Sequence, residues 1–155
     1  MIRPALPTDT PGLLEMATAT GVFKPFEVDT LKEVLDDYHS HGADDGHRCF
    51  VLEENAAQLG FEYHSAEPMT EGTWTLWWIV VKAHTQGKGI GGRLIQWAEH
   101  DAKALGARVI FLQTSGLPHS ELTRKFYLKQ GYDQEARLRD FYAQGDDQIV
   151  FRKAL

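Results

Sequence analysis

A glycine-rich segment lies between the strongest predicted strand and an amphipathic helix, and this arrangement constrains the fold more than any other feature of the chain. The segment is Gln86-Gly87-Lys88-Gly89-Ile90-Gly91-Gly92. Before it, Thr73–Val81 is dense in tryptophan, leucine, isoleucine and valine, which favours a strand. After it, apolar residues recur at helical spacing over residues 90–105. The segment therefore gathers unpaired backbone N–H groups at the positive end of a helix, where a phosphate group fits.

Two common phosphate-binding loops are disfavoured at this position. The spacing Gly87-x-Gly89-x-x-Gly92 formally matches the dinucleotide fingerprint, but that loop normally follows the first strand of its domain directly. Here Ala83-His84-Thr85-Gln86 separates the strand from the glycines, and further strands come earlier in the chain. A nucleotide-hydrolase loop requires Ser or Thr after Gly-Lys, whereas Gly89 follows Lys88.

The remaining hydrophobic patterns predict a mixed sheet. Strands are expected at Ile2–Ala5, Arg48–Glu53, Leu59–His64, Thr73–Val81, Arg108–Gln113, Gln134–Tyr142 and Gln148–Lys153. Helices are expected after a cap at Thr8 or Asp9, and at Glu27–Tyr38, Ile90–Leu105 and Ser120–Gln130. A helix separates Val81 from Arg108, so the strands that they bound should be parallel and joined by a right-handed crossover.

The fold class that follows is α+β. We expect a mixed, mostly antiparallel sheet of six to seven strands, flanked by about four helices, with a central β-α-β crossover. A length of 155 residues suits one domain, and we expect a single domain over residues 1–155. Trp74, Trp77 and Trp78 alternate imperfectly along their strand and are expected to fill the core and line a channel.

Charge and composition exclude several classes of protein. The formal net charge of -6 argues against nucleic acid as the main partner. No apolar run approaches the roughly 20 residues of a membrane span, so we expect no membrane partner. The lone Cys49 cannot form an intramolecular disulfide, and the first residues do not resemble a secretion signal, which indicates a cytoplasmic location. The polar residues 39–49 include histidines and acids, but their spacing matches no named zinc pattern and predicts a polar loop.

The charges are unevenly distributed along the chain. Residues 27–71 carry a formal charge of -10, and residues 82–129 carry +5. Ordinary solvated faces are one explanation. The functional alternative is that the second half holds an anionic ligand and the first half faces a cationic one.

Two motifs resemble those of the GNAT acyltransferase superfamily. Its strand-loop-helix signature is similar to Val81 followed, after a spacer, by Gln86-Gly87-Lys88-Gly89-Ile90-Gly91. Its second motif, Asn-x-x-Ala-x-x-(Phe or Leu)-Tyr-x-x-x-Gly-Phe, is similar to Ser120-x-x-Thr123-x-x-Phe126-Tyr127-x-x-x-Gly131-Tyr132. The motifs occur in the family's order and spacing, with matching elements over the whole chain. The resemblance implies a GNAT-like sheet and an N-acetyltransferase that uses acetyl-CoA as acyl donor, with no metal.

The resemblance also implies which residues bind the cosubstrate. In the family, the strand before the loop splays from its neighbour and pairs with the pantetheine arm, a role that would fall to Ile79, Val80 and Val81. The pyrophosphate would be enclosed by Gln86, Gly87, Lys88, Gly89, Ile90, Gly91 and Gly92. Ser120 replaces the usual Asn and would keep one hydrogen bond to the cosubstrate.

Tyr127 matches the family tyrosine that protonates the departing coenzyme A thiolate. An unprotonated primary amine would attack the thioester carbonyl directly, with the oxyanion held by a backbone N–H near Val81. From reference pKa values near 10 and 8.5, the transfer from tyrosine to sulfur is uphill by only about 2 kcal/mol.

The proton of the attacking amine has a less obvious acceptor. The strand Thr73–Val81 contains no acid, and Gln113 occupies the comparable place on the following strand. Glu62 is the nearest carboxylate candidate for a catalytic base, with His64 and His119 as weaker ones. We favour an amine of low pKa or a water relay over direct abstraction from a lysine-type amine.

The segment Arg137–Asp147 resembles the final hairpin of ribosomal-protein alanine N-acetyltransferases, where an Arg-x-Asn-Tyr-Tyr stretch faces the peptide. Asp140 and Phe141 depart from the Asn and Tyr of that stretch. Asp140 and Tyr142 nevertheless remain the acceptor-binding candidates. The acceptor is expected to be a small-molecule or peptide amine, so an N-terminal peptide acetyltransferase is one alternative. A non-catalytic acyl-CoA-binding regulatory module is another, which Gln113 and Ser120 favour and Tyr127 disfavours. Members of this family often pair, so a homodimer is one expected assembly.

Overall fold

The computed structural model describes residues 1–42, 44–85 and 87–155. Over this part of the chain, seven strands form one sheet in the order β1-β2-β3-β4-β5-β7-β6. The strands are Ile2–Pro4 (β1), His47–Glu54 (β2), Ala57–Ala66 (β3), Thr73–Val81 (β4), Val109–Ser115 (β5), Asp133–Ala143 (β6) and Asp146–Ala154 (β7). The helices are Thr10–Ala19 (α1), Pro25–Asp37 (α2), Ile90–Ala104 (α3) and Glu121–Lys129 (α4), with short turns at Pro7–Asp9, Tyr38–Gly42 and Pro118–Ser120. This architecture confirms the α+β prediction.

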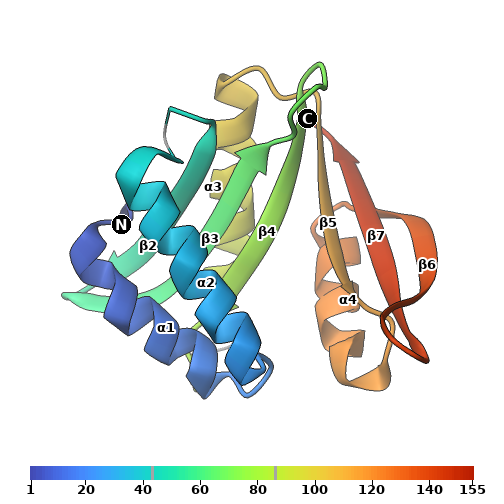
Figure 1. Ribbon diagram of the computed structural model, residues 1–155, viewed down its shortest axis with the longest axis horizontal. Coiled ribbons are helices and arrows are strands. Elements are labelled where there is room, and N and C mark those ends of the chain that lie inside the picture. Colours follow the sequence, from blue (N-terminus) through green and yellow to red (C-terminus); the bar gives the residue numbers. More distant parts are fainter. Residues whose placement is uncertain (43, 86) are drawn as a thin grey trace.

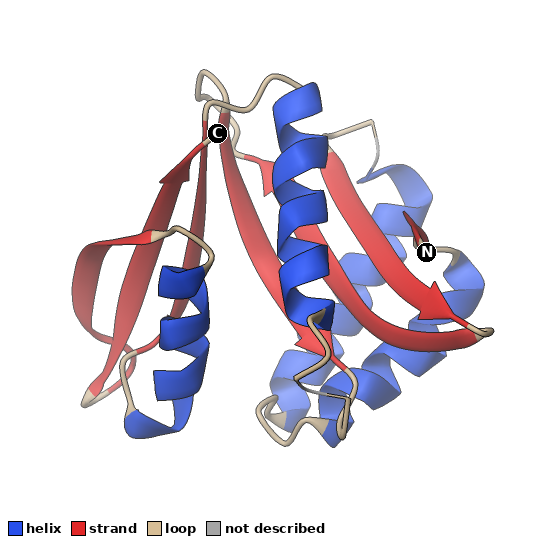
Figure 2. Ribbon diagram, turned by 180° about the vertical axis from the view of Figure 1, so that it is seen from behind, coloured by secondary structure: helices blue, strands red, loops and turns tan. Residues whose placement is uncertain are grey.

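The helices cover both faces of the sheet. Helices α1 and α2 lie on one face, across β2, β3 and β4 (Figure 1), and α3 and α4 lie on the other (Figure 2). Leu13, Leu31 and Phe61 are fully buried between the first pair and the sheet, whereas Ile95 and Ile110 are fully buried beneath α3. Each of these side chains contributes about 1.5–3 kcal/mol through burial. The core therefore consists of two layers that fix the helices to the sheet.

Strands β4 and β5 form the predicted parallel pair, but only over a short stretch. Thr73, Trp74 and Thr75 pair with Val109, Ile110 and Phe111. Beyond these residues, β5 continues to pair with β7, and β4 continues to pair with β3. Figure 1 shows the two strands moving apart along their length. The second half of β4 therefore has an edge that no described strand occupies.

A β-bulge explains why β4 bends at this point. Tyr63 on β3 pairs with Trp78, whereas the next residue, His64, pairs with Leu76, so Trp77 is the extra residue. A bulge increases the local twist and bends the strand that contains it. Trp77 is 46% exposed, and its indole N–H donates to Ser65 Oγ at 2.8 Å. Trp77 therefore does not fill the core as expected, and the expectation that it lines a channel stays a prediction.

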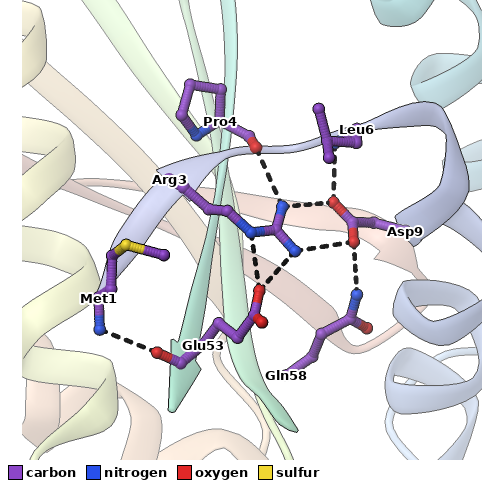
Figure 3. Close-up of polar contacts among 7 residues, drawn as sticks. All are labelled: Met1, Arg3, Pro4, Leu6, Asp9, Glu53 and Gln58. Carbon is purple, nitrogen blue, oxygen red and sulfur yellow. Dashed lines mark hydrogen bonds and ion pairs between the residues drawn. The ribbon is translucent and has the colours of Figure 1, made fainter. Parts of the chain in front are cut away.

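A partly buried group of ion pairs fixes the start of the chain to the sheet (Figure 3). The Arg3 guanidinium donates to the Asp9 carboxylate at 2.7 and 3.0 Å and to Glu53 at 2.7 Å. The Leu6 N–H and the Gln58 side-chain amide each donate to Asp9 at 2.7 Å. Its hydrogen bond with Arg3 is the main cause that lowers the pKa of Asp9. Asp9 directly precedes α1, as the sequence predicted, but its side chain makes no cap bond there.

None of the helices in the described part of the chain is both long and apolar enough to cross a bilayer.

Candidate functional site

The glycine segment adopts backbone angles that only glycine tolerates easily. Gly87 and Gly89 have positive φ angles of 86° and 74°, and Gly89 is the N-cap of α3. A Cβ atom at either residue would meet no described atom within 4 Å, so the backbone there faces open space. Lys88 is exposed between them, and Gln86 lies outside the described residues.

The first turn of α3 offers free donors to this open space. Its first intrahelical bond runs from Arg93 N to Gly89 O at 3.0 Å. The preceding amides, those of Ile90, Gly91 and Gly92, donate to no carbonyl of a described residue before the helix. These donors and the positive helix end favour an anion at this position.

Small residues bring α4 against the same turn. A Cβ at Gly91 would lie 3.3 Å from Phe126 Cζ, and one at Gly92 would lie 3.4 Å from the Gln130 amide nitrogen. Phe126 and Gln130 belong to α4 and its C-cap. The two sequence motifs, which are about 30 residues apart, therefore meet in space.

The open edge of β4 begins beyond Thr75 and ends with the strand at Val81, shortly before the glycine segment. Ile79, Val80 and Val81 pair with β3 on one side, and no described strand pairs with them on the other. The Val80 side chain is buried, whereas Ile79 and Val81 are partly exposed. Backbone groups of this edge are available to a ligand that lies along it.

Tyr127 lies on α4 with its ring packed against β7. Its ring centroid is 5.5 Å from that of Phe151 and 6.3 Å from that of Tyr132. Burial, with a smaller contribution from Tyr142, raises the pKa of Tyr127 to about 12. The phenol is therefore protonated at neutral pH, and we find no hydrogen bond from its hydroxyl to another described residue. Ser120, at the N-cap of α4, is buried and makes no side-chain cap bond.

The bulged end of β6 presents Tyr142. The register between β6 and β7 shifts between Leu138 and Ala143, so the residues between them leave the regular ladder. Tyr142 is 47% exposed, and its hydroxyl accepts a hydrogen bond from the Gln148 amide at 3.3 Å. Tyr142 also contributes, after burial, to the raised pKa of Tyr127.

Asp140 has a structural function within the same hairpin. Its φ angle is 56°, in the left-handed region that Asp tolerates better than most residues. Its carboxylate accepts a hydrogen bond from Gly145 N at 2.8 Å, and its own N–H donates to Asp147 at 3.0 Å. These bonds hold the bulge and leave Asp140 less available for an acceptor than its sequence position suggests.

Glu62 on β3 pairs with Ile79 of β4, and its side chain lies on the face of the sheet that α3 covers, where it contacts His64. It is fully buried, and its Oε2 atom is 2.7 Å from His64 Nδ1. His64 Nε2 is 2.9 Å from Asp101 on α3, and Arg48 donates twice to Asp101 at 2.8 Å. Complete burial does not fit a base that contacts the acceptor amine.

The sequence did not reveal this charge network. Burial raises the pKa of Glu62. Burial also lowers the pKa of His64, but the carboxylates of Glu62 and Asp101 outweigh it and raise this pKa to about 9. The only signal in the sequence was the two-residue spacing of Glu62 and His64, which places both side chains on one face of a strand.

Comparisons with known proteins agree with this geometry. Residues 45–134 match a family model described as an acetyltransferase (GNAT) domain. A GNAT-family protein from Desulfovibrio desulfuricans, of known crystal structure, is 35% identical to the chain. Its TM-score is 0.95, and the match covers 99% of this chain and 98% of that one. Among curated proteins, none matches the chain.

Two more distant structures share the fold. An aminoglycoside 6'-N-acetyltransferase complexed with coenzyme A is 17% identical with a TM-score of 0.81, over 99% of this chain and 96% of that one. The ribosomal-protein-alanine N-acetyltransferase from Brucella melitensis is 18% identical with a TM-score of 0.79, over 100% and 99%. The family model spans more than half of the chain, and the 35% identical structure spans nearly all of it. The chain is therefore a member of the GNAT family of N-acetyltransferases.

Proposed function

We propose that this protein, as a single domain over residues 1–155, transfers the acetyl group of acetyl-CoA to a primary amine by direct attack. The observation that carries the proposal is the free edge of β4 beside the glycine segment. An acyl-pantetheine arm that bonds to this edge would place its thioester where β4 and β5 move apart. Tyr127 lies on the helix that contacts the same glycine segment, and we assign it the role of general acid.

The residues of the segment fit a diphosphate. We assign its binding to the amides of Gly87, Lys88, Gly89, Ile90, Gly91 and Gly92, and the pantetheine arm to Ile79, Val80 and Val81. Gln86 belongs to the same proposed site by sequence. Ser120 would contribute one hydrogen bond to the cosubstrate. The open space at Gly87 and Gly89 supports this assignment, because phosphate oxygens need close access to the backbone.

The Tyr127 hydroxyl supplies a proton as negative charge develops on sulfur. With a tyrosine pKa of about 12 and an ordinary thiol pKa near 8.5, complete transfer is uphill by about 5 kcal/mol. Donation to the sulfur as the carbon–sulfur bond breaks is therefore more favourable than protonation before it. A backbone N–H near Val81 would hold the oxyanion, as in other acyl transfers.

The acceptor must lose a proton without a carboxylate in direct contact. Glu62 lies on β3 in register with Ile79 of β4, but its burial limits it to an indirect role. An amine with a reference pKa near 8 costs only about 1 kcal/mol to deprotonate at pH 7, whereas a lysine-type amine costs about 4.6 kcal/mol. We therefore propose an acceptor amine of low pKa that releases its proton to water.

A thiol-release assay tests the proposed function. Purified protein is incubated with acetyl-CoA and a panel of amines that includes peptides with free N-termini, and free thiol is measured with and without acceptor. Acceptor-dependent thiol is the expected result. Binding of coenzyme A by calorimetry without acceptor-dependent thiol would instead identify a non-catalytic acyl-CoA-binding module.

Substitution of Gly89 by alanine should weaken acetyl-CoA binding about tenfold. The positive φ costs a residue with a Cβ about 1–2 kcal/mol, and relief of this strain would misplace at least one amide that bonds the diphosphate. Gly106→Ala is the matched control, because Gly106 has a φ of 94°, has open space around it and lies at the far end of α3. Calorimetry should show weaker binding for Gly89→Ala alone. Equal affinities for the two variants would contradict the assignment.

A further inference from the structure

Trp77 is a large aromatic side chain that stays exposed on a central strand of the sheet. The last residue of β4 that pairs with β5 is Thr75, so Trp77 lies two residues beyond the point where these strands separate. Its indole N–H bonds to the hydroxyl of Ser65, which is buried on β3. Ser65 is two residues from Tyr63, which packs in the cluster with α1 and α2, and such residues share one face of a strand. The indole therefore lies on the face of the sheet that α1 and α2 cover.

Phe111 on β5 lies on the same face, across the line of separation. It pairs in register with Thr75, and the preceding residue, Ile110, is buried in the cluster beneath α3. Because successive side chains of a strand alternate, Phe111 points to the opposite face, which is the face of Trp77. Phe111 is partly exposed and is not one of the side chains that pack against the buried hydrophobic clusters of the described residues. Two aromatic side chains therefore flank the point where β4 and β5 separate.

The acceptor should approach the thioester from this face. The glycine segment begins α3, and Tyr127 lies on α4, so both belong to the opposite face of the sheet (Figure 2). A cosubstrate bound as proposed would therefore fill the gap between β4 and β5 from the side of α3 and α4. On the other face, no helix of the described chain lies over β5 (Figure 1). An amine that attacks the thioester directly would then pass Trp77 and Phe111.

The groups beside the two rings favour an apolar ligand over a second cation. The indole N–H of Trp77 is used in its bond to β3, and the Thr75 hydroxyl donates to the Glu67 carboxylate at 2.6 Å. Arg152 is in register with Phe111, so it adds a positive charge to the same face and would repel another cation. The rings themselves are the surface that remains for a ligand. Aromatic rings pair favourably with one another, either stacked with an offset or edge to face.

We propose that the acceptor carries an aromatic group next to its reacting amine, and that Trp77 and Phe111 bind this group. Both are then specificity-determining residues that take no part in proton transfer. This proposal rests on the proposed acetyl transfer to an amine.

The test compares acceptors that differ only in the aromatic group. Phenylalaninamide and alaninamide have the same α-amine and differ by one phenyl group, and their rates are compared per unprotonated amine. Burial of the phenyl group should make the wild-type kcat/KM for phenylalaninamide at least about tenfold higher than that for alaninamide. In Trp77→Ala, this ratio should fall to within about threefold, mainly through a higher KM for phenylalaninamide.

The variants separate recognition of the ring from folding. A general loss of folded or active protein affects both acceptors equally, so the ratio between them is not changed by it. Phe111→Leu keeps most of the apolar volume and removes the second ring, and it should also lower the ratio. Leu105→Ala is the matched control, because it shortens an apolar side chain that is 54% exposed at the C-cap of α3, on the other face of the sheet. This control should keep the wild-type ratio.

The outcomes distinguish this inference from the proposed function. Equal kcat/KM values for the two acceptors in the wild-type protein, or a wild-type ratio in either folded variant of the two rings, overturn this inference. Acetylation of alaninamide or of other amines in the same assay would still leave the proposed function standing. Absence of thiol release with every amine overturns both.

Discussion

Tyr127→Phe should lower kcat for amine acetylation at least about 100-fold, the lower bound of what a positioned general acid contributes. The substitution removes only the hydroxyl, and the ring contacts with Phe151 and Tyr132 are retained. Calorimetry should therefore show an acetyl-CoA affinity within about twofold of wild type. A loss of kcat without a loss of binding is typical of an interaction made only in the transition state.

Tyr132→Phe is the matched control for this substitution. Tyr132 packs beside Tyr127, but its hydroxyl donates to Glu99 at 2.9 Å, so it is engaged within the fold. Loss of that bond should lower the free energy of unfolding by about 1 kcal/mol and leave kcat close to wild type. Wild-type turnover in Tyr127→Phe would remove Tyr127 from the mechanism. An equal loss of kcat in both variants would indicate a packing effect instead of proton donation.

The elements of this fold were predictable because each has a strong local signal. Thr73–Val81 was predicted with the same bounds as β4, and Gly106 and Gly131 have the positive φ angles that end a helix. The glycine segment was predictable for the same reason, since free amides at a helix start follow from local geometry. The imperfect alternation of the tryptophans around Trp77 was visible in the sequence. A bulge and a strand buried on both faces give the same pattern, so the bulge itself was not predictable.

The side-chain partners in the site were less predictable, because they come from distant segments. Glu62 is two residues from His64, but Asp101 and Arg48, which complete the network, lie on α3 and β2. Glu62 was therefore predicted as a candidate base, and its burial beside His64 was not predicted.

His64→Leu should lower the free energy of unfolding by about 3–5 kcal/mol at pH 7, the usual cost when one partner of a buried ion pair is removed. Both His64 and Glu62 are fully buried, and Glu62 Oε1 has no other described partner. The variant would leave the Glu62 carboxyl group buried without its imidazole. In the double variant Glu62→Leu/His64→Leu, most of this stability should return, because two apolar side chains suit the core between β3 and α3. Urea unfolding of the three proteins measures both effects.

The same network predicts how stability depends on pH. The pKa of His64 is raised from 6.5 to about 9, so its contribution is fully present below pH 6.5 and is lost as pH rises through 9. The free energy of unfolding should therefore fall by about 3 kcal/mol between pH 6.5 and 9.5. Asp101 has a lowered pKa, so its contribution is lost only under acid conditions, outside this range. His64→Leu should flatten the curve over the same interval. If the wild-type protein were equally stable at both ends of it, His64 would have to be neutral in the folded state, and its two carboxylate contacts would be ordinary hydrogen bonds.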